Sequence, residues 1–122
     1  MSYQITVSEN GKYFRIRSSG DVTVEHAYRW SEDLKEMSQA HGIRRYLFDV
    51  RNSRNVSDVL ENYKFAYRDA DRLGLDKTVR SAILVSYGDQ SHDFIAATMH
   101  NAGFYVRLFT DERAAMLWLD DF

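Results

Sequence analysis

The chain opens with two runs in which polar and apolar residues alternate, and this opening constrains the fold more than any other stretch. Residues 3–8 place Ile5 and Val7 on one face, and residues 13–17 alternate in the same way. Between them, Asn10-Gly11 is a dipeptide typical of the tight turn of a β-hairpin. Two strands before any helix therefore predict an N-terminal antiparallel hairpin, and they argue against a flavodoxin-like or response-regulator fold.

After the hairpin, segments with helical periodicity alternate with short apolar runs. Apolar residues recur at helical spacing over residues 24–41, 59–73, 92–102 and 114–119. Compact apolar runs predict strands over residues 46–50, 79–85 and 104–109, and residues 52–55 read as a polar loop. The side chains expected to cap the helices are Thr23, Ser57, Ser91 and either Thr110 or Asp111.

The order of these elements is β-β-α-β-α-β-α-β-α. Strands that alternate with helices favour parallel pairing through helical crossovers. No linker, repeat or low-complexity tract interrupts the 122 residues, which is a usual size for one domain. We therefore predict a single α/β domain over residues 1–122, with a mixed and mainly parallel sheet covered by helices.

Composition excludes several classes of function. The formal net charge of −2 shows no basic footprint for nucleic acid or for an anionic membrane. The chain has no cysteine, so disulfides, iron–sulfur clusters and thiol catalysis are excluded. No signal peptide and no apolar run long enough to span a bilayer is present. We expect a cytoplasmic protein that needs no cofactor.

Two stretches carry a resemblance to a known family. Residues 42–51, Gly-Ile-Arg-Arg-Tyr-Leu-Phe-Asp-Val-Arg, resemble the third strand of STAS domains, and residues 107–119 resemble their last strand and helix. Within that group the chain is similar, over residues 3–119, to the SpoIIAA-like anti-sigma-factor antagonists. The resemblance implies a non-catalytic regulatory module that binds another protein, such as one similar to an anti-sigma factor.

The same resemblance draws attention to the start of the second helix. Antagonists of that family are switched by phosphorylation of a serine there, within a segment that resembles Asp-Ser-Ser-Gly. Residues 51–58 of this chain read Arg-Asn-Ser-Arg-Asn-Val-Ser-Asp and lack the paired serines and the glycine. Ser53 and Ser57 lie in the corresponding region and are the candidate phosphorylation sites.

A ligand site is expected at the carboxyl ends of the parallel strands, where α/β sheets bind their ligands. The loop after the third predicted strand supplies a set of polar candidates: Arg51, Ser53, Arg54, Asn55 and Ser57. The two guanidinium groups and the amides of a helix N-terminus suit an anion such as phosphate or a carboxylate. The alternative interpretation is that the serines only cap helices and that the arginines are solvated.

Histidine spacing does not indicate a metal site. His92 and His100 lie eight residues apart on one predicted helix, which separates them by about 12 Å along its axis. No serine–histidine–acid pattern and no phosphate-binding glycine loop is evident either. We therefore predict neither a metal nor a catalytic centre.

Aromatic residues are more numerous on the second predicted helix than a narrow apolar stripe needs. The stripe consists of Val59, Tyr63, Ala66, Ala70 and Leu73, and Phe65 falls away from it. Phe65 then lies at the margin of a broad buried face, in a contact with a partner or a second copy, or on a helix that admits an apolar ligand. The preferred function is thus a regulatory protein-interaction module, and the alternative is a binder or carrier of an anionic or apolar small molecule.

Overall fold

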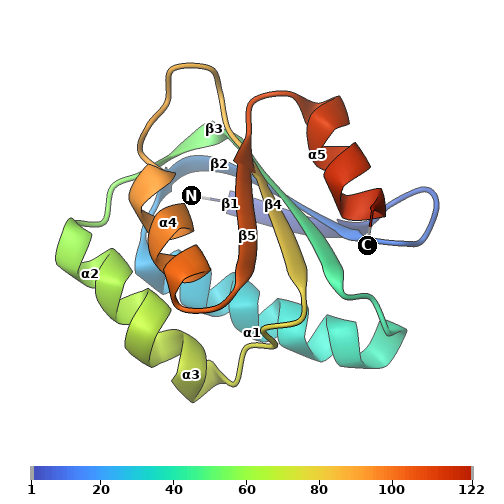
Figure 1. The fold of residues 1–122 in the computed structure, drawn as a ribbon, viewed down its shortest axis with the longest axis horizontal. Helices are drawn as coiled ribbons and strands as arrows, with labels where there is room; N and C mark the ends of the chain where they lie inside the picture. Colours follow the sequence, from blue (N-terminus) through green and yellow to red (C-terminus); the bar gives the residue numbers. More distant parts are fainter. Residues whose placement is uncertain (1, 122) are drawn as a thin grey trace.

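The computed structural model describes residues 2–121 and confirms the predicted α/β architecture (Figure 1). The strands are β1 (Ser2–Val7), β2 (Phe14–Val22), β3 (Arg45–Asn55), β4 (Arg80–Leu84) and β5 (Tyr105–Phe109). The helices are α1 (Val24–His41), α2 (Val59–Lys64), α3 (Ala70–Leu73), α4 (Asp93–Asn101) and α5 (Glu112–Asp120). A π-helical turn, η1 (Phe65–Asp69), joins α2 directly to α3.

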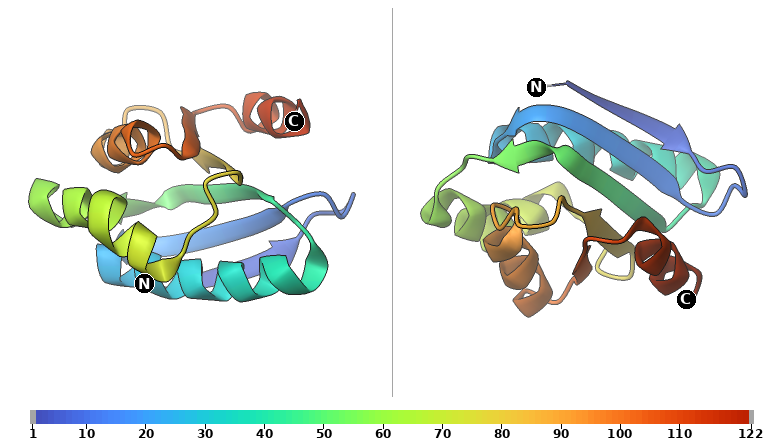
Figure 2. Two further views of the ribbon diagram at one scale, coloured as in Figure 1. Left: turned by 60° about the horizontal axis from the view of Figure 1, so that its bottom comes forward. Right: turned by 90° about the horizontal axis from the view of Figure 1, so that it is seen from above.

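The five strands lie in sequence order across one sheet. β1 and β2 form the predicted antiparallel hairpin, in which Gly11 adopts the left-handed conformation (φ 72°) that its turn requires. The other pairings are parallel. Crossovers between parallel strands are nearly always right-handed, so strands added in sequence order place their crossover helices on one face of the sheet. That leaves α5 to cover the opposite face (Figure 2, left view).

Two clusters of buried side chains reflect this division. On the α1 face, Phe14 and Ile16 of β2 pack with Trp30 and Leu34 of α1. On the α5 face, the cluster consists of Tyr13, Leu47, Ala82, Leu84, Ala115 and Leu119. Leu47 and Ala82 are register partners in β3 and β4, and both are fully buried. Alternation along the strands supplies each face with its own apolar set.

β3 continues well beyond its apolar run, and the predicted loop over residues 52–55 is wrong. Asn52 to Asn55 pair in register with Ser19 to Val22 at the end of β2. Arg17 pairs with Asp49 and Ser19 pairs with Asn52, so β3 contains one extra residue between these two pairs, which is a β-bulge. Polarity suggested a loop, but the backbone of these residues is held by the neighbouring strand.

The bulge changes which β3 side chains face the α1 side. Before it, Asp49 lies on the α5 face with Leu47. After it, the Ser53 hydroxyl lies 2.7 Å from the Ser18 hydroxyl, and both side chains are buried. A bulge adds one residue to one strand, so the two-residue alternation resumes on the other face. Ser53 and Asn55 therefore reach the α1 side of the sheet, although they share odd numbering with Asp49.

The α2–η1–α3 segment buries a different face from the predicted one. Its buried residues are Asn62, Phe65, Ala66, Asp69 and Ala70, whereas Val59 and Tyr63 of the predicted stripe are at least half exposed. Ala66 and Ala70 of the predicted stripe are buried as predicted, so the helical spacing was correct and the buried face is shifted in phase. The phase differs because two polar side chains, Asn62 and Asp69, are buried with hydrogen-bond partners.

Two of the predicted helix caps also differ in the structure. Asp58, not Ser57, is the N-cap of α2, and its carboxylate accepts from the Glu61 amide at 2.8 Å. The Ser57 hydroxyl instead accepts from the amide of Val24 at 2.9 Å, in the first turn of α1. Thr23 is the N-cap of α1 as predicted, and α4 begins after His92 rather than after Ser91.

Candidate functional site

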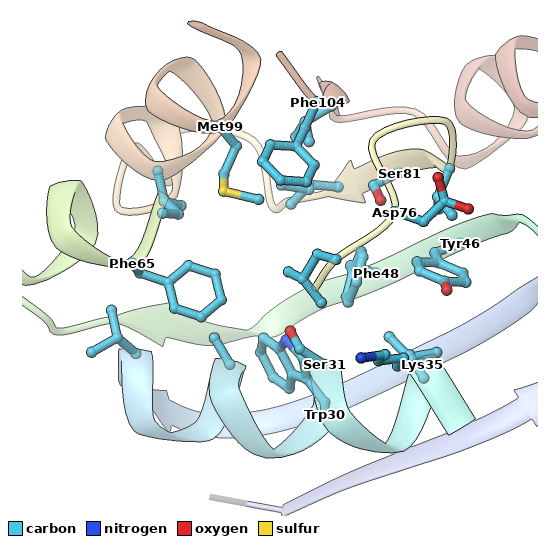
Figure 3. A pocket seen from close by; sticks show the side chains of 18 of the residues that line it. Trp30, Ser31, Lys35, Tyr46, Phe48, Phe65, Asp76, Ser81, Met99 and Phe104 are labelled. Atoms are coloured by element: carbon cyan, nitrogen blue, oxygen red, sulfur yellow. The ribbon is translucent and has the colours of Figure 1, made fainter. Parts of the chain in front are cut away.

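A cavity of about 490 Å³ lies between the sheet and the helices of its α1 face. α1 forms one wall, the α2–η1–α3 segment and α4 form the others, and β3, β4 and β5 form the floor (Figure 3). Its largest apolar lining residues are Trp30, Leu34, Phe48, Phe65, Met99 and Phe104. The crossover helices of this face therefore do not fill the space between themselves and the sheet.

The floor of the cavity follows from strand register. Phe48 of β3 is the partner of Ile83 in β4, and Tyr46 is the partner of Ser81, which pairs in turn with Val106 of β5. All five side chains line the cavity. Side chains that are directly opposite in paired strands point to the same face. The floor is therefore apolar at Phe48, Ile83 and Val106 and hydroxyl-bearing at Tyr46 and Ser81.

Residues one turn apart along α1 give its wall a mixed character. Trp30 and Leu34 are buried and line the cavity. Ser31, Lys35 and Ser38 follow each other on successive turns beside them and line it as well. The wall is thus an apolar stripe bordered by a polar one.

Phe65 closes the cavity from the α2–η1–α3 side. It is 4% exposed, and its ring meets that of Tyr28 edge-on with the centroids 6.0 Å apart. The end of the same segment is tied to α1, because the Lys35 ammonium donates to the carbonyl oxygen of Leu73 at 2.9 Å. The cavity therefore lies beneath a helical segment that contacts α1 near its middle, at Phe65, and at its end, at Leu73.

Side-chain amides close the cavity where β3 ends. Asn62, 4% exposed, donates to the carbonyl oxygens of Ser57 and Asp58 and accepts from the Asn55 amide at 3.1 Å. His92 lies beside them with its Nε2 atom 3.3 Å from the Ser53 carbonyl oxygen. Asn55, Asn62 and His92 all line the cavity. Their hydrogen bonds to the protein hold this end shut.

Tyr46 and Asp76 mark the opposite end of the cavity. Burial raises the pKa of Tyr46, and the nearby charge of Asp76 adds to this, although the bond to the Ser38 hydroxyl opposes it. The phenol therefore stays neutral near neutral pH. Hydrogen bonds from Thr78 and then the charge of Arg44, 3.4 Å away, hold the pKa of Asp76 below its usual value. Asp76 is thus an ionised, already paired carboxylate.

The structure divides the residues that the sequence placed in one anion site. Asn55 lines the cavity, and Ser57 bonds to Asn55 and to α1 at its edge; Phe65, the separate aromatic candidate, lines the cavity as well. Ser53 is buried against Ser18, whereas Arg54 is exposed. An anion at Arg51 and Arg54 remains a prediction, and it would have to compete for Arg51 with two carboxylates.

Those carboxylates belong to a charge cluster on the α5 face. Arg51 donates two hydrogen bonds to the Asp49 carboxylate, from Nε at 2.9 Å and from Nη2 at 2.7 Å. Arg15 and Arg17 lie 3.5 and 3.7 Å from the same carboxylate. Glu112, in the first turn of α5, lies 2.9 Å from Arg15 and 3.3 Å from Arg51. Burial alone raises the pKa of Asp49, but the Arg51 hydrogen bonds and the charges of Arg51 and Arg15 outweigh it, and the pKa lies below its usual value.

Sequence reasoning did not identify most of the cavity-lining residues. Trp30 and Leu34 were assigned to a helix stripe, and Phe48 to a buried strand, which is how core residues read. The polar row of Ser31, Lys35 and Ser38 beside that stripe was the available signal. A polar row that runs along a buried stripe indicates either a solvated edge or a lined cavity, and periodicity alone does not separate them.

The chain matches no family model and no curated protein. Among solved structures it is similar to an uncharacterized DUF3478-family protein with a SpoIIAA-like fold from Shewanella loihica PV-4. The TM-score is 0.60 at 25% identity, covering 97% of this chain and 92% of the other. This chain has the SpoIIAA-like fold.

A second solved structure supports the SpoIIAA-like fold. The unphosphorylated form of the anti-sigma factor antagonist SpoIIAA matches with a TM-score of 0.55 over 99% of this chain and all of the other, at 11% identity.

Within residues 2–121, none of the helices has the length and apolar character that a membrane span requires. Within the same residues, no group of three or more histidine and acidic side chains is placed to hold a metal ion.

Proposed function

We propose that the protein binds an apolar small molecule in the cavity on its α1 face and serves as a carrier or sensor of that molecule. The cavity itself carries the proposal. Protein interiors are close-packed and leave few voids larger than a water molecule. A space of about 490 Å³ falls instead in the range of about 300–1,000 Å³ that is typical of small-ligand sites.

The lining also fits this function. Aromatic and aliphatic side chains from four different elements, Trp30, Phe48, Phe65 and Met99 among them, converge on one space (Figure 3). An apolar ligand that enters removes both its own surface and theirs from water, at about 25 cal/mol per Å² buried. Methionine adds a flexible contact that adapts to the shape of the occupant.

A cavity-filling substitution tests the proposal. Ile83→Phe adds a larger side chain to the cavity floor, and we expect it to weaken binding of the apolar fluorescent probe N-phenyl-1-naphthylamine by about tenfold, since overpacking removes the space that the probe occupies. The matched control is Val7→Phe, which makes the same kind of enlargement on β1 at a site 45% exposed and outside the cavity lining.

Probe binding is measured by fluorescence titration of protein stripped of bound small molecules, and native mass spectrometry of protein as purified shows any retained ligand. Equal affinities for the two variants, with both correctly folded by circular dichroism, would count against the cavity as the binding site. Absence of probe binding by the unmodified protein would remove the proposal altogether.

A regulatory protein-interaction module is the second candidate, and one observation favours it. Val59, Leu60, Tyr63 and Tyr67 form an exposed apolar row on α2 and η1, with exposed fractions between 42% and 63%. The rings of Tyr63 and Tyr67 are in contact, tilted by 34° with their centroids 4.7 Å apart. The SpoIIAA-like fold agrees with such a role, and Ser57, less buried than Ser53, is the more accessible of the two candidate phosphorylation sites.

This second candidate predicts association through the exposed row. If the row is a contact between two copies of the chain, Leu60→Ser combined with Tyr63→Ser should convert a dimer to a monomer with little change in stability, because both residues are at least half exposed. Sedimentation equilibrium measures the mass. A monomer before and after the substitutions would exclude the homodimer, and a partner protein would then be sought by the same variants in co-purification.

A further inference from the structure

Polar groups line both ends of the cavity, but Asn55, Asn62 and His92, where β3 ends, are already hydrogen-bonded to the protein. Figure 3 shows Lys35, Tyr46, Asp76 and Ser81 together at one end, with Phe65 and Met99 at the other. Register and contacts agree with the picture: Tyr46 and Ser81 are neighbours on the floor, and the Tyr46 hydroxyl meets the Ser38 hydroxyl of the α1 wall. A ligand that fills the cavity therefore meets apolar side chains along its middle and, at the Tyr46 end, polar groups that do not all have partners in the protein.

Some of these polar groups already have partners and some do not. Tyr46 and Ser38 bond to each other, and Asp76 is held by Thr78 and Arg44. Ser31, in contrast, is 9% exposed, lines the cavity, and has no hydrogen-bond partner within residues 2–121 for its hydroxyl. The Ser31 hydroxyl faces the open space of the cavity, so a molecule that fills the cavity can supply the hydrogen-bond partner that the protein does not.

Ser81 repeats this observation from the floor. Its side chain is half-buried and lines the cavity, and its hydroxyl too lacks a hydrogen-bond partner in the part of the chain that the structure describes. Ser31 and Ser81 belong to α1 and β4, so two independent elements each present a free hydroxyl to the same space. A hydroxyl can donate one hydrogen bond, which an oxygen of a ligand could accept.

Lys35 adds a positive charge to this end. Its ammonium donates to the Leu73 carbonyl oxygen, and no carboxylate within residues 2–121 lies within 4.0 Å of it. An ammonium has three donors and no acceptor, so further hydrogen bonds remain available. The nearest lining acid, Asp76, already pairs with Arg44. The free groups of this end can thus all donate a hydrogen bond, and their net charge is positive.

We infer that the ligand of the cavity is an amphipathic carboxylate, whose apolar chain lies among Trp30, Phe65 and Met99 and whose carboxylate lies near Lys35, Ser31 and Ser81. This inference rests on the proposed function, that the cavity holds a small molecule. A carboxylate accepts only, with two oxygens, and so matches an ammonium and hydroxyl donors. Charge-assisted bonds of this kind are about twice as strong as neutral ones.

The test uses three probes with the same ten-carbon chain and different head groups: decanoate, decanol and decyltrimethylammonium. Each probe is titrated against protein with bound N-phenyl-1-naphthylamine at neutral pH, and displacement of the dye is measured. The probe concentrations stay below those at which the probes form micelles. We expect decanoate to bind about tenfold more tightly than decanol, because its head group gains charge-assisted bonds, and the cation to bind most weakly.

Lys35→Gln locates the head group. The substitution removes the charge at an exposed position. We expect it to weaken the binding of decanoate about fivefold or more, while the affinity for decanol changes by less than about twofold. Ser31→Ala should reduce the preference for decanoate in the same direction, since it removes the buried donor. Lys12→Gln, in the β1–β2 hairpin and outside the cavity lining, is the matched control and should change neither affinity.

The outcomes separate the two proposals. If no probe displaces the dye, or the dye does not bind, the cavity is not a ligand site and both proposals fail. If decanol binds as tightly as decanoate, or Lys35→Gln lowers both affinities equally, the cavity binds apolar molecules but the carboxylate assignment is wrong. Tightest binding of decyltrimethylammonium would instead assign Asp76 as the group that selects the ligand.

Discussion

Replacing Asp49 by alanine is expected to lower the free energy of unfolding by about 3 kcal/mol, because removing one partner of a buried ion pair leaves the other uncompensated. Asp49 is 4% exposed and neutralises Arg51, which grips it with two hydrogen bonds, and it attracts Arg15 and Arg17. Arg51 and Arg17 still reach solvent, so the cost lies at the low end for buried pairs. Urea denaturation followed by circular dichroism measures it.

Glu112→Ala is the matched control for this effect. Glu112 touches two of the same arginines, but its side chain is 39% exposed, and exposed pairs contribute about 1 kcal/mol or less. If Asp49→Ala costs no more than Glu112→Ala, the cluster does not stabilise the fold in the way that its geometry indicates.

The same network makes stability depend on pH in a definite direction. The pKa of Asp49 is lower in the folded protein than its usual value of about 3.9. The Asp49 carboxylate therefore makes its full contribution to the free energy of unfolding above that pH. The contribution is lost as the pH falls through the folded pKa, where the unfolded chain already binds the proton. The difference in stability between the unmodified protein and Asp49→Ala should therefore be constant near neutral pH and shrink below about pH 4.

Phe65→Ala is expected to cost about 3 kcal/mol of folding free energy, at the low end for deletion of a buried aromatic side chain. Phe65 is 4% exposed and packs edge-on against Tyr28, so its removal forfeits burial and an aromatic contact. The cost stays at the low end because the ring already borders the cavity and has no protein atoms on that side. The measurement is again urea denaturation, with the midpoint and slope compared.

Tyr67→Ala provides the comparison on the same helical turn. Tyr67 is 42% exposed and contacts mainly Tyr63, and we expect a cost below about 1 kcal/mol. Similar costs for the two variants would show that Phe65 is not part of the core. A change of molecular mass for Phe65→Ala without loss of stability would assign Phe65 to an interface, one of the roles that its place off the predicted stripe suggested.

The element order was predictable because each strand or helix has a recognisable pattern within its own stretch of sequence. The hairpin follows from strand alternation around Asn10-Gly11, and α1 follows from its stripe between Thr23 and the left-handed Gly42 that ends it. Element order and strand succession were then enough to imply a mainly parallel sheet, which the strand pairings confirm. Local propensity and long-range packing agree over most of the chain, as they do in sequences that fold to one structure.

Predictions were less successful where polar residues are buried. Asn52 to Asn55 read as a loop, yet they pair with the end of β2. Asn62 and Asp69 are not in the apolar stripe predicted for this segment, yet both are buried with hydrogen-bond partners. Partners that come from other elements, such as Asn55 for Asn62, have no signal in the local sequence. A burial pattern that counts only apolar residues therefore assigns the wrong face to such a segment.

The sequence by itself determined the order of strands and helices, because alternation, helical spacing and capping residues act over a few neighbouring positions. Only the tertiary structure decided where the candidate site lies. The β3 bulge directs Asn55 to the α1 side and leaves Arg51 on the other, so the residues predicted for one anion site lie on two faces. The cavity likewise exists because three crossover helices meet over one face without filling it, and packing between distant segments leaves no periodic trace in the chain.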